Sequence, residues 1–282
     1  MPSVAAMVVA GAARLRAAGL TPEDADRDAA VIARGLLGWS LADWLSQRGR
    51  EADAPFIDAF DPLITRRATF EPVAYLLGTR EFYGRPFYVQ SGVLIPRPET
   101  ELLIETALQW ISATGARNIA DVGTGSGCIS VTLALEVPDL HIVATDQSFD
   151  ALAVAQRNAH DLDVHGRIEW RHTDLLNGIE APLDLVVSNP PYVPERDRPT
   201  LSPDVRDHEP ALALFAGDDG LDVIRRLIPD AARHLRPGGG LILEVGAGQS
   251  ATVTSLLSDA GFTNVTWHAD LQKIPRIVAA QK

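Results

Sequence analysis

From Asn118 onward the sequence alternates short runs rich in β-branched residues with longer stretches of helical periodicity. This alternation is typical of a doubly wound α/β sheet, in which helices cover both faces of a mostly parallel sheet. Ligands of such sheets bind beyond the carboxyl ends of the strands, so the residues that follow each strand are candidates for a binding site. Seven strands are expected, at residues 119–122, 141–145, 168–172, 183–188, 241–245, 264–268 and 276–279.

A glycine-rich turn, Gly123-Thr124-Gly125-Ser126-Gly127, follows the first expected strand. Glycine lets the backbone turn sharply and approach a ligand closely. Cys128 stands where the third glycine of a G-x-G-x-x-G dinucleotide fingerprint would fall, which favours a nucleoside cofactor without a pyrophosphate. Because no base accompanies it, Cys128 is expected to be a small packed residue and not a nucleophile.

Acidic residues follow the next two strands. Asp146 lies 23 residues after Gly123, where a carboxylate can accept hydrogen bonds from both hydroxyls of a ribose. The segment Thr173-Asp174-Leu175 has two interpretations that the sequence leaves equally open. Either Asp174 and Leu175 contact an adenine, or Asp174 caps a helix. With the glycine turn, these acids predict a nucleoside site at one edge of the sheet.

The fourth strand ends in Asn189-Pro190-Pro191-Tyr192. We interpret this tetrad as the catalytic pocket of a methyltransferase that acts on a planar NH2 group. The nitrogen of an amide or aromatic NH2 group has a delocalised lone pair, and the amide rotation barrier of about 18–20 kcal/mol measures that delocalisation. A catalyst that methylates such a nitrogen must hold both N–H groups with fixed acceptors. Asn189 offers a side-chain oxygen, Pro190 offers a backbone carbonyl, and the proline rings restrict the backbone. Tyr192 would stack on the flat substrate. The alternative is a rigid turn in which Asn189 bonds only to nearby backbone.

Charge is distributed unevenly along the 282 residues. Residues 1–80 carry 9 Lys and Arg against 10 Asp and Glu, whereas the remainder carries 16 against 27. A protein that binds nucleic-acid phosphates is expected to present a basic face, so the acidic remainder disfavours a nucleic-acid substrate. One cysteine excludes an intramolecular disulfide, no histidines have metal-ligand spacing, and no segment is typical of a signal peptide or membrane span. We therefore expect a cytoplasmic protein without a metal.

Residues 1–78 are expected to form a small helical domain. Thr21-Pro22-Glu23-Asp24 is typical of a helix start and Gly38 of its end, and residues 41–48 predict a shorter helix. Pro62 is expected to kink or divide a further apolar stripe, which consists of Phe56, Phe60, Leu63 and Ile64. The domain is either a structural cap or a platform for a protein partner, and the spacing of its residues does not distinguish these.

Residues 79–97 interleave aromatic and β-branched residues with glycine and proline, which predicts a β-hairpin linker. The run Pro96-Arg97-Pro98-Glu99-Thr100 then opens a helix. Arg97 and Glu99 either face a ligand or cap this helix, and capping is the simpler interpretation. Residues 98–282 would form the catalytic domain.

Several stretches of the chain together form a set of motifs: residues 71–76, 81–84, 93–101, 121–127, 188–192, 209–210, 219–221 and 244–246. The set resembles that of the bacterial peptide chain release factor glutamine methyltransferases. These enzymes use S-adenosylmethionine to methylate the side-chain nitrogen (N5) of the glutamine in the Gly-Gly-Gln motif of release factors. The tetrad at 189–192 does not separate this family from enzymes that methylate DNA adenine, whereas the run at 95–100 is specific to it.

The resemblance implies a class I S-adenosylmethionine-dependent methyltransferase with a Rossmann-like sheet. It places Gly123 to Gly127 at the methionine moiety and Asp146 at the ribose. The family commonly has an aromatic residue at the position of Leu175, so the adenine contact differs here. The tetrad would receive the glutamine, with Asn189 and Pro190 as the catalytic residues and Asn189 also beside the donor methyl. No role follows for Arg97 or Glu209.

The resemblance further implies that the helical domain docks the release factor. We expect a monomer that acts on class I release factors, with no nucleic acid and no membrane involved. Methyl transfer would be in line and driven by positioning and desolvation, which agrees with the lack of histidine in the motifs. Three rivals remain: a methyltransferase of nucleic-acid amino groups, a glutamine methyltransferase for a ribosomal protein, and a cofactor-binding scaffold without turnover.

Overall fold

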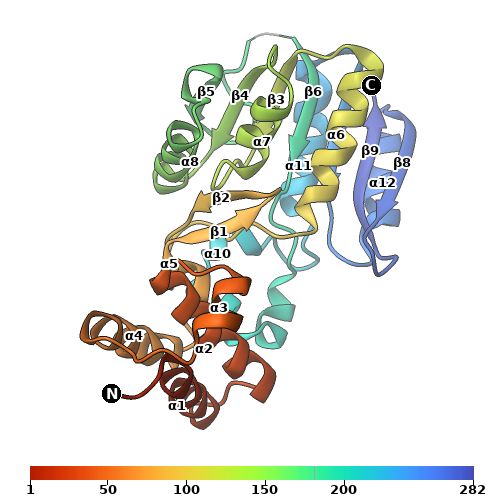
Figure 1. The fold of residues 1–282 in the computed structure, drawn as a ribbon. Helices are drawn as coiled ribbons and strands as arrows, with labels where there is room; N and C mark the ends of the chain where they lie inside the picture. The colour runs from red at the N-terminus through yellow and green to blue at the C-terminus, as the bar shows by residue number, and fades with distance from the viewer. Residues whose placement is uncertain (181) are drawn as a thin grey trace. The chain divides into compact units, whose positions relative to one another are not determined.

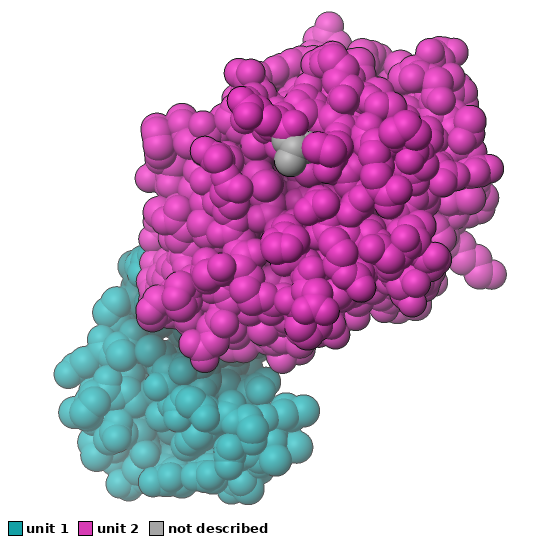
Figure 2. All heavy atoms as spheres, turned by 90° about the horizontal axis from the view of Figure 1, so that it is seen from above, with its two compact units in different colours: residues 1–79, 202–208 teal, residues 80–201, 209–282 magenta. Residues whose placement is uncertain are grey.

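The computed structural model of the protein describes residues 1–180 and 182–282 (Figure 1). The chain forms two compact units, which Figure 2 colours separately. Residues 1–79 and 202–208 form the helical unit, and residues 80–201 and 209–282 form the sheet unit. None of the helices in the described part of the chain is both long and apolar enough to cross a membrane.

The helical unit packs its helices around one apolar core that includes Leu15, Ile32, Phe60 and Ile64. Its helices are α1 (Val4–Ala17), α2 (Pro22–Leu37), α3 (Leu41–Gln47), α4 (Ala54–Arg67), α5 (Val73–Leu77) and α9 (Pro203–His208). The expected start and end of α2 are confirmed, because the Thr21 side chain accepts a hydrogen bond from the Asp24 N–H and Gly38 is left-handed.

Pro62 does not divide α4, which runs unbroken from Ala54 to Arg67. Proline removes one helical hydrogen bond, but Phe56, Phe60 and Ile64 are buried on one face of α4 and hold both halves of the helix on the same core. In this helix, tertiary packing outweighs the local cost of the proline ring.

A buried ion pair links α4 to α2 within the helical unit. Arg67 Nε donates to Asp28 Oδ2 at 2.8 Å, and both side chains are almost fully buried. The short helix α9 joins this cluster, since Asp204 Oδ2 lies 3.9 Å from Arg67 Nη2 and His208 Nε2 lies 2.9 Å from the Thr69 carbonyl oxygen. A segment from the second half of the chain thus completes the helical unit.

The sheet unit contains a seven-stranded sheet in the order β5-β4-β3-β6-β7-β9-β8. The first five strands are parallel, and β9 runs antiparallel to both β7 and β8. The bounds are β3 (Asn118–Val122), β4 (His141–Asp146), β5 (Ile168–His172), β6 (Leu183–Ser188), β7 (Leu235–Glu244), β8 (Thr263–Ala269) and β9 (Pro275–Gln281). The doubly wound fold and all seven expected strands are confirmed.

Strand β7 begins six residues earlier than expected, at Leu235. The sequence Arg236-Pro237-Gly238-Gly239 suggests a turn, but here it forms an irregularity in the strand. Leu183 pairs with Leu235 and Leu185 pairs with Gly240, so extra residues on β7 are accommodated between two paired positions. The glycines permit this bulge without steric cost.

Helices cover both faces of the sheet (Figure 1). Apolar residues of α6 (Thr100–Thr114), α7 (Cys128–Glu136) and α8 (Phe149–Asp161) pack on one face, and those of α11 (Asp222–His234) and α12 (Ser250–Asp259) pack on the other. The remaining elements are η1 (His165–Arg167), η2 (Glu195–Thr200), α10 (Ala211–Leu214) and a two-stranded sheet of β1 (Thr79–Phe82) and β2 (Arg85–Tyr88), which lies in the expected hairpin linker.

The contact between α6 and β7 yields a test of this packing. A Cβ added at Gly240 would lie 2.5 Å from Trp110 Cε2, and the indole is a rigid ring system that packs against the apolar core. We expect Gly240→Ala to lower the free energy of unfolding by about 1–3 kcal/mol, the usual cost of overpacking, as measured by urea denaturation. Gly166→Ala is the matched control, because a Cβ at Gly166 meets nothing within 4 Å. Equal stability of both variants and the wild type would contradict this account.

Candidate active site

A cavity of about 290 Å³ lies in the sheet unit beyond the carboxyl ends of β3, β4 and β6. The strand order reverses between β3 and β6, and such a switch point is where doubly wound sheets bind ligands. The cavity wall contains most of the residues that the sequence singles out: Gly123, Thr124, Gly125, Ser126, Asp146, Leu175, Asn189, Pro190 and Pro191. Gly127, Asp174 and Tyr192 are near the site but are not part of this wall.

Hydrogen bonds to the end of β4 shape the glycine turn. The N–H groups of Gly123 and Thr124 both donate to the Thr145 carbonyl oxygen at 2.9 Å. Gly123, Gly125 and Gly127 all have positive φ, which explains why glycine alternates along the turn. A Cβ at Gly123 would meet nothing within 4 Å, so the turn leaves open space for a ligand at this point.

Gly127 has a second reason to be glycine. A Cβ there would lie 2.9 Å from the Ala155 Cβ on α8, so Gly127 allows α7 and α8 to pack closely. Contact between Gly127 and a cofactor stays a prediction.

Asp121, the last residue but one of β3, supports the turn from inside the protein. Its Oδ2 accepts hydrogen bonds from the Thr124 hydroxyl at 2.6 Å and from the Ser130 N–H at 3.1 Å. Burial raises the pKa of Asp121 to about 6, although these hydrogen bonds oppose the shift. Burial likewise raises the pKa of Cys128 to about 12, so its thiol is protonated and packed, as expected.

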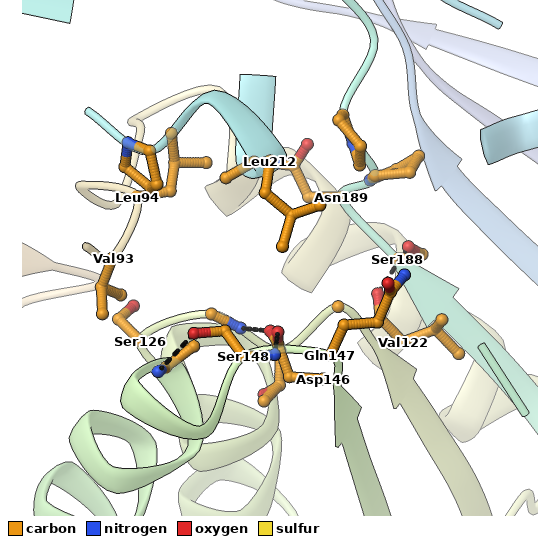
Figure 3. Close-up of a pocket in the computed structure, with 18 of the residues that line it drawn as sticks. Val93, Leu94, Val122, Ser126, Asp146, Gln147, Ser148, Ser188, Asn189 and Leu212 are labelled. Atoms are coloured by element: carbon orange, nitrogen blue, oxygen red, sulfur yellow. Dashed lines mark hydrogen bonds between the residues drawn. The ribbon is translucent and has the colours of Figure 1, made fainter. Parts of the chain in front are cut away.

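Asp146 ends β4 and forms part of the cavity wall (Figure 3). Its Oδ2 accepts a hydrogen bond from the Gly125 N–H at 2.9 Å, and its Oδ1 accepts one from the Ser148 N–H at 2.8 Å. Burial raises the pKa of Asp146, and the backbone hydrogen bonds oppose that shift. The carboxylate therefore couples the glycine turn to the loop that begins α8.

The Asp174 carboxylate does not cap a helix, because its oxygens bond to two side chains. One oxygen accepts a hydrogen bond from Gln147 Nε2 at 2.9 Å, and the other forms an ion pair with Arg226. Leu175, with φ of 52°, lines the cavity. Adenine binding by these residues stays a prediction. Leu175 is the better placed of the two, because it lines the cavity and Asp174 does not.

The tetrad begins immediately after β6. The Asn189 Nδ2 amide donates to the Thr100 hydroxyl oxygen at 3.1 Å, so this side chain bonds to a residue far along the chain and not to the local backbone. Pro190 and Pro191 line the cavity. The Tyr192 hydroxyl donates to Glu244 Oε1 at 3.2 Å, and stacking of the Tyr192 ring on a substrate stays a prediction.

Arg97 forms an ion pair and does not cap α6. Its Nη2 lies 2.5 Å from Glu209 Oε1, while Glu209 Oε2 accepts a hydrogen bond from the Ile95 N–H at 3.2 Å. Glu99 occupies the N-cap position, but its side chain makes no capping hydrogen bond. The capping interpretation is therefore wrong for both residues. The pair instead joins the loop before α6 to the segment before α10, and Arg97 lines the cavity.

Sequence reasoning missed several residues of the cavity wall. Figure 3 shows Asp146, Gln147 and Ser148 on one side of the cavity, with Leu94 and Leu212 across from them. Leu94 precedes a family-specific run, and Gln147 and Ser148 follow a strand end, so their positions carried a usable signal. Leu212 lies on the four-residue helix α10, whose sequence has no feature that indicates a site.

Two family models match the chain: Methyltransferase small domain over residues 98–202 and PrmC N-terminal domain over residues 7–78. A release factor glutamine methyltransferase of Bradyrhizobium diazoefficiens is 44% identical over 278 residues, which cover 96% of this chain and 92% of the relative. One from Cereibacter sphaeroides is 42% identical, with 95% and 94% covered. The chain belongs to the release factor glutamine methyltransferase family.

Solved structures support the fold of this methyltransferase. The hMettl16 catalytic domain, in complex with MAT2A 3′UTR hairpin 6, matches with a TM-score of 0.59 at 19% identity, covering 77% of this chain and 81% of that one. The T. Thermophilus 16S rRNA N2 G1207 methyltransferase, in complex with AdoMet and guanosine, matches with a TM-score of 0.53 at 20% identity, covering 72% and 49%. At such identities the likeness concerns the fold alone.

No group of three or more His, Cys, Asp and Glu side chains in residues 1–180 and 182–282 of the methyltransferase is arranged to hold a metal ion. The polar residues of the cavity wall are instead the carboxylate of Asp146, several hydroxyl residues, the amides Gln147 and Asn189, and the guanidinium groups of Arg97 and Arg226. This set suits a nucleoside with a charged amino-acid tail.

Asp146 offers a test of the cofactor site. Each carboxylate oxygen of Asp146 accepts a hydrogen bond from a backbone N–H group, whereas an asparagine at this position has only one acceptor oxygen. A hydrogen bond to a charged group contributes about 1.5–3 kcal/mol. We expect Asp146→Asn to weaken S-adenosylmethionine binding by about tenfold to a hundredfold in calorimetry. Asp150→Asn, an exposed acid on α8, is the control and should bind as the wild type does. An unchanged dissociation constant for Asp146→Asn would remove Asp146 from the cofactor site.

Proposed function

We propose that this protein transfers the methyl group of S-adenosylmethionine to the side-chain amide nitrogen of a glutamine in a peptide chain release factor. One observation carries the proposal. The glycine turn with Asp146 and the turn that begins at Asn189 line the same cavity at the switch point of the sheet. The cofactor site and the site for an NH2 group that we propose are therefore adjacent.

The cofactor site fits S-adenosylmethionine. Open space at Gly123 and Gly125 lets the methionine part approach the backbone, and the Asp146 carboxylate is available to ribose hydroxyls at the end of β4. Leu175 offers an apolar surface for the adenine. S-adenosylmethionine supplies an electrophilic methyl group and leaves as S-adenosylhomocysteine.

The acceptor site holds the amide nitrogen by both of its N–H groups. Because the Asn189 amide N–H2 is directed at Thr100, its Oδ1 remains as an acceptor for one N–H of the substrate. The Pro190 carbonyl oxygen accepts the other. Held in this way, the nitrogen presents its electron density to the methyl group without help from a strong base.

The reaction balances without any further reactant. A bond forms between the amide nitrogen and the methyl carbon as the bond between that carbon and sulfur breaks, and the electron pair of that bond passes to sulfur. The nitrogen has then become acidic and releases one proton to water. Asn189 and Pro190 hold the nitrogen throughout, while Leu94 and Leu212 contribute apolar surface to the cavity wall.

The family and the charge pattern support our proposal for the partner and the setting. The helical domain at residues 1–78 is nearly neutral and would dock a class I release factor that contains a Gly-Gly-Gln motif. The acidic balance of the remaining chain argues against a nucleic-acid substrate. We take the enzyme to be a cytoplasmic monomer with no membrane and no metal involved.

The experiment that tests the function uses radiolabelled S-adenosylmethionine with three substrates. They are a release factor, the same factor with its Gly-Gly-Gln glutamine replaced, and unmethylated DNA. Label on the intact factor alone is the expected outcome, and it identifies donor, reaction and target residue together. Label on DNA would overturn the substrate, and label on no substrate would overturn the function.

Asn189 is the residue whose loss should matter most. Removing one preorganised hydrogen-bonding group from an active site costs about 10²–10³ in kcat, and we expect a loss of that size for Asn189→Ala with a release factor as substrate. Thermal unfolding of the variant should match that of the wild type. A folded variant with nearly normal turnover would show that Asn189 is not catalytic.

A further inference from the structure

Three polar side chains from distant parts of the sheet unit form a hydrogen-bonded chain behind Asn189. Asn189 Nδ2 donates to Thr100 Oγ1 at 3.1 Å, and the Thr100 hydroxyl donates to Glu244 Oε2 at 2.7 Å. The Tyr192 hydroxyl donates to the other carboxylate oxygen of Glu244 at 3.2 Å. Thr100 and Glu244 are almost fully buried, with 2% and 1% of their surface exposed.

The direction of these hydrogen bonds follows from the chemistry of the groups. An ionised carboxylate only accepts hydrogen bonds, so Thr100 must give its single hydroxyl proton to Glu244. The Thr100 oxygen is then left only as an acceptor, and it can bond to Asn189 only through the Asn189 N–H2 group. The Asn189 carbonyl oxygen must therefore point away from Thr100, toward the cavity.

We propose that Thr100 and Glu244 are positioning residues that fix which way the Asn189 side-chain amide faces, so that its carbonyl oxygen is presented to the substrate NH2 group. This inference rests on the function proposed above and assigns two further residues to the same site. An asparagine amide has nearly the same shape in its two flipped orientations. Without this hydrogen-bonded chain, the Asn189 amide would also adopt the flipped orientation. In that orientation its N–H2 group would face the substrate and repel the N–H groups of the substrate amide.

The charge state of Glu244 links this chain to pH. Burial, with a smaller contribution from the charge of Glu99, raises the pKa of Glu244 to about 7, while the hydrogen bonds from Thr100 and Tyr192 and the charge of Arg276 oppose the shift. Cys128 on α7 is electrostatically influenced by Glu244, and burial raises the pKa of its thiol to about 12, so it is protonated at neutral pH. A protonated Glu244 can donate to Thr100, which frees the Thr100 hydroxyl to bond the Asn189 oxygen and reverses the amide. Turnover should therefore rise with pH through about 7.

The first test compares three variants of the full-length enzyme with a release factor as substrate. Thr100→Val removes the hydroxyl at nearly constant volume and should lower kcat by about tenfold to a hundredfold, somewhat less than losing the Asn189 group itself. Thr100→Ser keeps the hydroxyl and should retain kcat. Thr106→Val is the matched control on the same helix, because the Thr106 hydroxyl bonds only to the Leu102 carbonyl oxygen in its own helix. S-adenosylmethionine affinity should be unchanged in all three.

A double-variant comparison separates positioning from a structural role. If Thr100 acts through Asn189, Thr100→Val should cause no further loss of kcat in an Asn189→Ala enzyme. An equal loss in both backgrounds would overturn the proposal, as would wild-type kcat for Thr100→Val.

The pH profile tests the part assigned to Glu244. The wild-type kcat should fall as pH drops from 8 to 6, and Glu244→Gln, which cannot titrate, should lose this step. A Glu244→Gln enzyme with the wild-type pH profile would exclude Glu244. These outcomes differ from failure of the proposed function, in which the wild-type enzyme itself would not methylate the release factor.

Discussion

The parallel pairing of β3 with β6 is the constraint on which the site depends. Asp121 on β3 pairs with Val187 on β6, so the two strands end at the same edge of the sheet. The glycine turn follows the first strand and Asn189 follows the second, and the Ser188 hydroxyl donates to the Val122 carbonyl oxygen at 2.6 Å between them. One pair of strands thus sets the spacing between the glycine turn and Asn189, the residues to which we assign the methyl donor and the acceptor.

Local features of the sequence were sufficient to predict much of the fold and part of the site. The glycine turn, Asp146 and Asn189 each follow a strand, and the geometry of parallel sheets brings strand ends together whatever the intervening sequence. Gly127 shows the limit of this reasoning, because its lack of a side chain serves the packing of α7 on α8. The sequence does not distinguish a glycine that leaves room for a ligand from a glycine that allows two helices to pack closely.

Contacts between distant residues account for what the sequence did not reveal. Arg97 and Glu209 lie 112 residues apart and Thr100 and Glu244 lie 144 apart, yet each pair is hydrogen-bonded. No periodicity or motif spacing encodes such pairs, because they depend on which loops the sheet order brings together. The same holds for Pro62, where the buried face of α4 decided between a broken and a continuous helix.

The helical unit is made of two segments of the chain, and α9 is separated from the rest of that unit by the sequence that carries Asn189. The chain therefore passes from one unit to the other three times, after residues 79, 201 and 208. Exchange of this unit by recombination would require matched changes at both segments, because Arg67 and Asp204 meet within it. Under the docking role that we propose for this unit, relatives of this enzyme should thus change their partner preference by point substitutions in the helical unit more readily than by acquiring a new unit.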